Sequence, residues 1–166
     1  MPTIYDALKK DHETVKGLLA RLVALKEESP ECKQLVEQIR DELIPHSRAE
    51  EAVFYNSLRS VPVVSDEAWH GYKEHMEAET LLRTLQVAEK VDAGFLTVAK
   101  KLKDALEHHI QEEEGELFRL AKTVVTEAEA EQMAQAFTSM KPKIKEKSIL
   151  GTTLNAYPKS VCDFTG

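Results

Sequence analysis

The sequence predicts an all-α protein, and three observations support this fold class. The 166 residues are rich in Ala, Leu, Glu and Lys, which are strong helix formers, and aromatic residues make up only 6%. No segment has the alternation of apolar and polar residues that is typical of a half-buried strand. Apolar residues instead recur at intervals of three and four along four long segments. One domain of this size, built as an up-down-up-down four-helix bundle, satisfies all three.

The first two helices are predicted from an N-cap and a proline boundary. Thr3 can cap a helix that runs to about Glu28, because its hydroxyl can accept from the first free N–H groups. Ser29-Pro30 ends this helix, since proline restricts the residue before it and suits the first turn of the next helix. A second helix is expected over residues 31–59. Pro45 lies inside it and should bend it, because proline removes one backbone hydrogen bond.

The second half of the chain repeats this plan. After a loop at residues 60–64, helices are expected from 65 or 66 to about 90 and from 93 to 125. Thr126 followed by Glu129 is a capping-box pattern, which predicts a short fifth helix ending near Met140. We therefore assign residues 1–140 to the bundle. Residues 141–166 are expected to form an irregular tail that packs on or beside the bundle.

Charge and cysteine usage limit the function classes. The net charge is -7, so the chain should repel nucleic acid and anionic membrane, and neither is expected as a partner. The lysine-rich run at residues 141–147 is interpreted as a solvated helix end. Two cysteines, Cys32 and Cys162, provide no disulfide framework and suit a reducing compartment. Without a membrane-length apolar run or a signal-peptide core at the start, a cytoplasmic location is expected.

Histidines and carboxylates interrupt the apolar stripes of all four long helices. Each stripe carries one histidine, and three of the four carry a glutamate four residues later, on the same face. In an antiparallel bundle these positions come to one level. Burying so many ionisable groups together costs several kcal/mol per unpaired charge, and a bound cation removes that cost. The predicted metal ligands are His12, His46, Glu50, His75, Glu79, His109 and Glu113.

Neighbouring polar residues receive other interpretations. His108 and His70 are expected to be solvated, and Tyr72 to pack on the inward face. Glu51 and Glu114 lie one step off the stripe, which suggests surface positions or contacts with the ligands. A ferritin-like site is rejected, because it needs two Glu-x-x-His motifs and only residues 67–70 fit that spacing.

Four segments together resemble the hemerythrin-like, or HHE cation-binding, domain over roughly residues 3–140. They are DHETV at His12, PHSRAEEAVFY at His46, KEHMEAE at His75 and LEHHIQEEEGELF at His109. The resemblance implies a non-haem di-iron centre, with Glu50 and Glu113 as bridging carboxylates, although zinc or manganese suits the same donors. Oxygen-carrying hemerythrins have a second histidine where this chain has Glu79. This difference disfavours reversible O2 carriage, and Glu79 is interpreted as a ligand or as an acceptor for a histidine N–H.

Two functions remain open from the sequence. The first is a di-iron protein that binds O2, NO or peroxide for sensing, storage or stress protection. The alternative is a di-iron redox enzyme that reduces or disproportionates reactive oxygen or nitrogen species. Both have a small diatomic molecule or a peroxide as partner, and neither specifies a protein partner. A metal-free interaction bundle would leave the inward histidines and acids unexplained.

Overall fold

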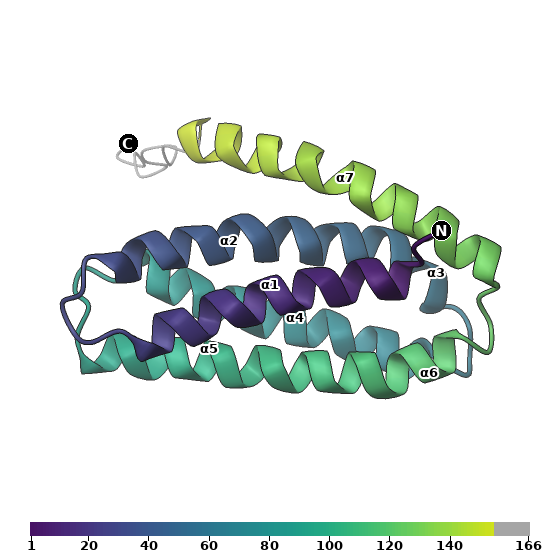
Figure 1. Cartoon of the computed structure of the whole chain (residues 1–166), viewed down its shortest axis with the longest axis horizontal. Coiled ribbons are helices and arrows are strands. Elements are labelled where there is room, and N and C mark those ends of the chain that lie inside the picture. Colours follow the sequence, from purple (N-terminus) through teal and green to yellow (C-terminus); the bar gives the residue numbers. More distant parts are fainter. Residues whose placement is uncertain (155–166) are drawn as a thin grey trace, which may run out of the picture.

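The computed structural model describes residues 1–154, with side chains described through Lys145. Four long helices run alternately up and down, as Figure 1 shows, and confirm the expected bundle. The described residues contain helices and no strand. The four long helices are α1 (Ile4–Ala24), α2 (Glu31–Glu50), α4 (Ser65–Val87) and α5 (Ala93–Glu112).

Two of the long helices continue through a short π-helical segment. After α2 come η1 (Glu51–Tyr55) and α3 (Asn56–Leu58), and after α5 come η2 (Glu113–Leu117) and α6 (Phe118–Ala121). The expected second and fourth helices are therefore single rods in which one turn is widened. π turns insert an extra residue into a helix and are frequent at functional sites.

The predicted helix starts are confirmed by their hydrogen bonds. Asp6 accepts from the Thr3 backbone N–H at 2.8 Å, and the Asp6 N–H donates to the Thr3 hydroxyl at 3.4 Å. Thr126 and Glu129 form the same reciprocal pair, at 2.8 and 3.3 Å. Both pairs satisfy N–H groups that the first turn of a helix leaves free.

The fifth helix is longer than expected. It is α7 (Glu127–Leu154), and it continues through Pro142, so the expectation of an irregular chain from residue 141 is wrong as far as Leu154. Apolar residues at helical spacing explain the continuation, because Phe137, Met140 and Ile144 all pack in one core cluster. The remainder of the expected tail, residues 155–166, lies outside the described residues.

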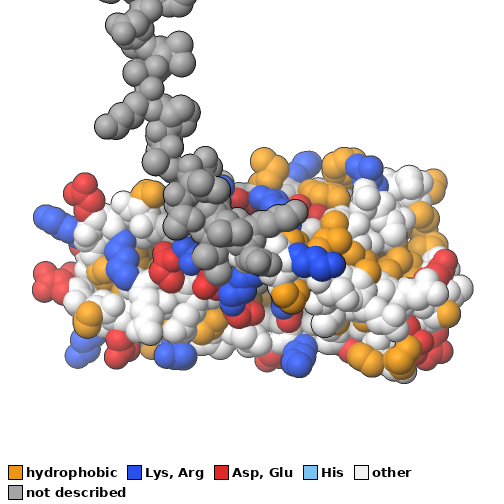
Figure 2. All heavy atoms as spheres, turned by 90° about the horizontal axis from the view of Figure 1, so that it is seen from above, with side chains coloured by type: hydrophobic (Ala, Val, Ile, Leu, Met, Phe, Trp, Pro, Cys, Tyr) orange, Lys and Arg blue, Asp and Glu red, His pale blue; other side chains and the backbone are white. Residues whose placement is uncertain are grey.

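Helix α7 lies along the side of the bundle formed by α1 and α2 (Figure 1). Seen from above that side, lysines and arginines are interspersed with acidic residues (Figure 2). Within residues 1–154, no helix is long and apolar enough to cross a membrane.

Two apolar clusters fill the bundle. One lies toward the α1–α2 and α4–α5 turns and includes Leu22, Leu85 and Phe95, and the other lies toward the opposite end and includes Ile4 and Phe118. Along every long helix the buried histidine falls between residues of the first cluster and residues of the second. The two clusters thus hold the polar centre at mid-height.

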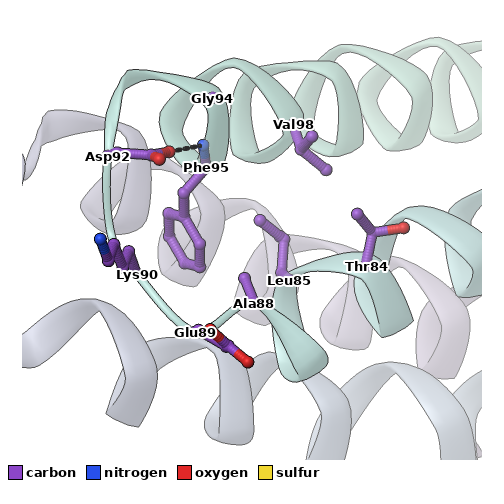
Figure 3. Close-up of a pocket in the computed structure, with 9 residues that line it drawn as sticks. All are labelled: Thr84, Leu85, Ala88, Glu89, Lys90, Asp92, Gly94, Phe95 and Val98. Carbon is purple, nitrogen blue, oxygen red and sulfur yellow. Dashed lines mark hydrogen bonds between the residues drawn. The ribbon is translucent and has the colours of Figure 1, made fainter.

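A hollow of about 390 Å³ lies at the α4–α5 turn (Figure 3). Asp92 belongs to its lining, and its Oδ1 accepts from the Phe95 N–H at 2.9 Å, which caps α5. None of the predicted metal ligands lines this hollow. We interpret it as a feature of the turn.

Candidate metal centre

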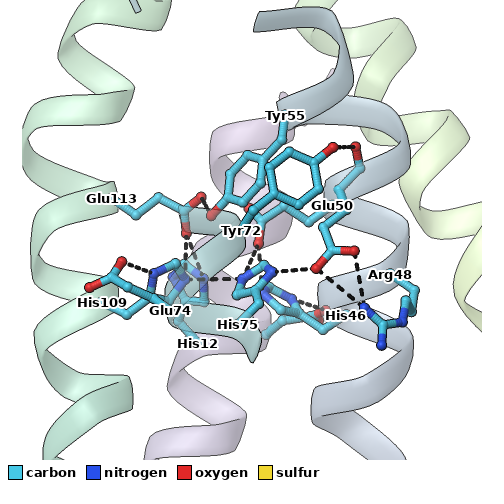
Figure 4. Close-up of polar contacts among 12 residues, drawn as sticks. His12, His46, Arg48, Glu50, Tyr55, Tyr72, Glu74, His75, His109 and Glu113 are labelled. Carbon is cyan, nitrogen blue, oxygen red and sulfur yellow. Dashed lines mark hydrogen bonds and ion pairs between the residues drawn. The ribbon is translucent and has the colours of Figure 1, made fainter. Parts of the chain in front are cut away.

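The four histidines converge inside the bundle, one from each long helix. Their side chains are 3–4% exposed. The Nε2 atoms of His75 and His109 lie 3.2 Å apart, and the ring centroids of His12 and His46 lie 5.1 Å apart. Figure 4 shows the four rings around the bundle interior. The structure therefore brings the predicted histidines to one level.

Two buried glutamates lie between these rings. Oε2 of Glu50 is 3.3 Å from Nε2 of His46 and 3.4 Å from Nε2 of His75. Oε2 of Glu113 is 3.3 Å from Nε2 of His12 and 3.8 Å from Nε2 of His109. Each carboxylate thus faces imidazoles from two different helices. Six of the seven predicted ligands meet here.

A second set of carboxylates holds the outer nitrogen of every ring. Each Nδ1 lies 2.8–3.2 Å from a carboxylate oxygen. An Nδ1–H that donates to a carboxylate leaves the Nε2 lone pair facing inward, which is the tautomer that a metal requires. The pairs are His12 with Glu114, His46 with Asp11, His75 with Glu51, and His109 with Glu74.

The centre is built from two equivalent halves of the sequence. Five polar residues of the centre in the α1–α2 half have counterparts of the same type in the α4–α5 half, all at one constant interval. The paired positions are Asp11 and Glu74, His12 and His75, His46 and His109, Glu50 and Glu113, and Glu51 and Glu114. The equivalence covers the first and third long helices as well as the second and fourth. The centre therefore has an approximate two-fold symmetry.

The π segments begin at the central glutamates. Glu50 is the last residue before η1, and Glu113 is the first residue of η2. At both places two successive glutamates reach histidines, because Glu51 contacts His75 directly after Glu50 does. The widened turn accounts for the departure from helical periodicity there.

The buried polar atoms without hydrogen bonds are concentrated in this centre. Of the five such atoms in the described part of the chain, four are Oε1 and Oε2 of Glu50, Oε2 of Glu113 and Nε2 of His12. The neighbouring rings lie within ion-pair distance of these oxygens but do not point N–H groups at them. An unpaired buried carboxylate is costly, and a cation among these nitrogen and oxygen atoms satisfies all of them. The residues present fit a metal.

A small cavity of about 10 Å³ adjoins the four rings. That volume corresponds to roughly one water molecule. Its apolar walls are Val15, Leu43, Leu106 and Ile110. Phe54 and Leu117 do not line this cavity and belong instead to the second core cluster.

The electrostatics also require positive charge. Burial disfavours protonation of His46, but Glu50 and Asp11 outweigh it and raise the pKa of His46 to about 10. In the same way Glu50 and Glu51 outweigh burial and raise the pKa of His75 to about 9. Burial and the Glu50 charge raise the pKa of Glu113. Without a metal, protons on the imidazoles balance the carboxylates.

Glu79 does not join the cluster, which corrects the prediction. Its Oε2 lies 2.5 Å from Nη2 of Arg48, and its Oε1 lies 3.1 Å from Nη2 of Arg83. The inward stripe of α4 runs from His75 to Ala78 and Leu82, so its spacing is three and then four. Glu79 lies one step away from this stripe and faces the arginines.

The neighbouring predictions mostly agree with the structure. The His108 side chain is 63% exposed and pairs with Glu112, as expected of a solvated residue. Glu51 and Glu114 contact the buried His75 and His12 and are partly exposed. Tyr72 is half-buried and donates its hydroxyl to the Glu51 carbonyl oxygen at 3.1 Å.

Three residues of the centre were missed from the sequence. Asp11 and Glu74 were not predicted, although each directly precedes one of the four buried histidines, in the pairs Asp-His and Glu-His. Tyr55 is fully buried, donates to Oε1 of Glu113 at 3.0 Å and stacks on His75. Nothing in the helical pattern distinguished it from a core aromatic residue.

Fold and site together define a cation-binding helical bundle, and comparison with known proteins gives its family. Residues 3–121 match the hemerythrin HHE cation binding domain. The chain belongs to this family, which confirms the resemblance. A crystal structure of a hemerythrin HHE cation binding domain-containing protein from Mycobacterium kansasii superposes with a TM-score of 0.80 at 22% identity, covering 93% of this chain and 94% of that one.

A longer relative has a different description. The chain is 28% identical over 147 residues to a DNA nickase from Nostoc sp. (strain PCC 7120 / SAG 25.82 / UTEX 2576). The match covers 87% of this chain but only 40% of the nickase, so this chain spans less than half of that relative's length.

Proposed function

We propose that this chain holds two metal ions, iron in particular, and that the pair binds O2, NO or peroxide for sensing, storage or stress protection. The single observation that carries the proposal is the convergence of four imidazoles on two buried carboxylates whose oxygens lack hydrogen bonds. The proposed ligands are His12, His46, Glu50, His75, His109 and Glu113.

The contacts support two cation positions with a shared ligand. Ligand atoms of His12, His46 and Glu50 lie within 4.8 Å of one another, and so do those of Glu50, His75 and His109. Glu50 belongs to both groups, so it would bridge the two ions. Glu113 lies between His12 and His109, one from each group, and would form the second bridge.

The chain's own residues define what the centre can do. The carboxylates at Nδ1 fix the four rings and keep the Nε2 atoms directed inward. Val15, Leu43, Leu106 and Ile110 exclude bulk water from the adjoining cavity, which has room for a molecule of about the size of water. When bound, a pair of irons supplies redox activity and coordination positions for a small oxidant.

The alternative is a redox enzyme that uses the same centre to reduce or disproportionate reactive oxygen or nitrogen species. The buried phenol of Tyr55 favours it, because this group is hydrogen-bonded to Glu113 and stacked on His75. The net charge of -7 opposes binding to a phosphate backbone and so disfavours DNA cleavage by this chain. The use of only two cysteines supports a proposed cytoplasmic location.

Metal analysis of protein purified without oxygen tests the proposal. We expect about two ions per chain, and an absorption spectrum that changes when O2, NO or peroxide is added. The proposal would be contradicted if the purified chain held no stoichiometric metal. It would also be contradicted if the metal-loaded chain showed no spectral change with any of the three molecules. Repeated consumption of peroxide or NO in the presence of a reductant would favour the enzyme.

A further inference from the structure

A third group of ligand atoms lies at the surface beside the buried centre. Atoms of His70, Glu74 and Glu112 lie within 4.8 Å of one another. Nε2 of His70 is 3.5 Å from Oε1 of Glu74 and 3.2 Å from Oε2 of Glu112. His108 adds a second imidazole, with its Nε2 at 3.1 Å from Oε1 of Glu112. One or two imidazoles and two carboxylates suit a divalent transition metal.

This surface group is connected to the buried centre. A cavity of about 10 Å³ is lined by His70, Glu74 and Glu112 and also by His109 and Glu113. Glu74 faces both ways, because its Oε1 is directed to His70 while its Oε2 accepts from Nδ1 of His109 at 2.8 Å. Glu113 carries an unpartnered buried oxygen and is 3% exposed. Ligand atoms therefore continue from the surface to the interior.

In the other half of the bundle, a lysine ammonium group occupies the equivalent place. Asp11 is the counterpart of Glu74, and the Lys141 ammonium of α7 contacts it. At the positions equivalent to His70 and Glu112 stand Ala7 and Ala49, which cannot ligate. The α1–α2 half thus has Lys141 beside Asp11, whereas the α4–α5 half has His70 and Glu112 beside Glu74.

We propose that His70, Glu74 and Glu112 form a loading site, which captures a divalent cation at the surface and passes it to the buried ligands by way of Glu74 and Glu113. This inference rests on the proposed function, because it requires the buried centre to be a metal site. The side chains of His70 and Glu112 are 50% and 41% exposed, so this site should bind a cation more weakly than the buried one. Since Glu74 contacts both His70 and His109, a cation can change partners without crossing apolar side chains.

Cobalt uptake by the metal-free full-length chain tests the loading site. The d–d absorption of Co2+ reports filling of the buried centre with time, and equilibrium dialysis gives the number of ions bound. We compare His70→Ala and Glu112→Gln, singly and together, with the wild type at low Co2+. The double variant should fill the buried centre about tenfold more slowly, reach the same buried occupancy and lose one weak ion.

Glu107→Gln is the matched control, because Glu107 and Glu112 both lie on α5 with side chains 41% exposed. It removes the same charge and should leave the filling rate unchanged. Equal filling rates in the wild type and the double variant would overturn the loading site while leaving the buried centre intact. A double variant that loses buried occupancy would also overturn it, since that result assigns a holding role. A wild type that binds no buried cobalt would refute the proposed function itself.

Discussion

Tyr55 donates its hydroxyl to Oε1 of Glu113 across the bundle, at 3.0 Å. The counterpart of Tyr55 in the other half is Phe118, which has no hydroxyl, and both oxygens of Glu50 are without hydrogen bonds. The two central carboxylates therefore differ in their hydrogen bonding. This hydrogen bond breaks the two-fold symmetry of the centre.

Replacing Tyr55 with Phe removes this donor and leaves a buried oxygen of Glu113 unpaired. We expect the free energy of unfolding of the metal-free chain to fall by about 1–3 kcal/mol. Urea denaturation measures the loss. Tyr72→Phe is the control, since Tyr72 is half-buried and donates to a backbone carbonyl, so its loss should be smaller. Equal losses for the two variants would contradict the special role of the Tyr55 hydroxyl.

Gly71 provides the space for Tyr55. A Cβ atom at this position would lie 2.6–2.7 Å from atoms of the Tyr55 ring, closer than real contacts allow. Gly71→Ala should therefore lower the free energy of unfolding by about 1–3 kcal/mol, because the buried ring must shift. Gly17→Ala, with nothing within 4 Å of its Cβ, should instead stabilise α1 by about 0.5–1 kcal/mol. A stabilised Gly71→Ala variant would show that the packing of this ring is not tight.

His108 and His109 are adjacent on α5, but only His109 points into the centre, so replacing each in turn tests which of them binds metal. His109→Ala should remove metal from the purified chain and lower the melting temperature of the loaded protein, since it deletes an inward imidazole. His108→Ala should do neither, because its side chain is 63% exposed. Metal content and thermal unfolding measure both effects. The reverse pattern would show that the ligand face of α5 is misassigned.

Replacing Glu79 tests whether this residue lies outside the metal centre, as its contacts with Arg48 and Arg83 indicate. Glu79→Gln weakens ion pairs with Arg48 and Arg83 and should cost about 1 kcal/mol or less, with metal content unchanged. Glu113→Gln should reduce metal content, since it neutralises a central carboxylate. If Glu79→Gln lost metal to the same degree, Glu79 would have to be a ligand after all.

The free energy of unfolding of the metal-free chain should decrease as pH rises from 6.5 to 10. The folded-state pKa values of His46 and His75, about 10 and about 9, lie above the ordinary value of 6.5. The folded chain therefore binds these protons more tightly than the unfolded chain does. Their stabilisation is fully present below pH 6.5 and is lost as pH rises through 9 and 10. Urea denaturation at pH 6.5 and pH 10 measures the decrease, and an increase would contradict the assigned environments.

Bound cations must displace those same protons. At pH 7 we expect Zn2+ uptake to release protons, because His46 and His75 are protonated in the metal-free chain. Calorimetric titration in two buffers of different ionisation enthalpy measures the number released. A result independent of the buffer would contradict protonated imidazoles in the empty centre.

The bundle and the six convergent residues could be predicted because helical periodicity determines which side of each helix faces inward. One histidine on the apolar stripe of each of the four helices already predicts a shared buried site from the sequence. The same rule failed for Glu79, since a residue four positions after His75 fits the helical spacing as well as Ala78 does. Only packing against neighbouring helices decides between such positions.

Other features depend on contacts between segments distant in sequence. Tyr55 of η1 reaches Glu113 of η2, which lies 58 residues further along the chain, and no local pattern encodes that hydrogen bond. The extension of α7 beyond Met140 likewise depends on the bundle, which provides a surface for Ile144 and an acidic partner for Lys141. The lysine-rich composition of this segment concealed its apolar stripe.

The division of the centre between two halves has a consequence for folding. Each helical hairpin contributes two of the imidazoles and one central carboxylate. Two bound metal ions would therefore crosslink regions that are distant along the chain. Such a crosslink reduces the conformational entropy of the unfolded state, with a larger effect for longer loops. Metal supply would then set the lifetime of the polypeptide, because chain made without the metal would open and be degraded sooner.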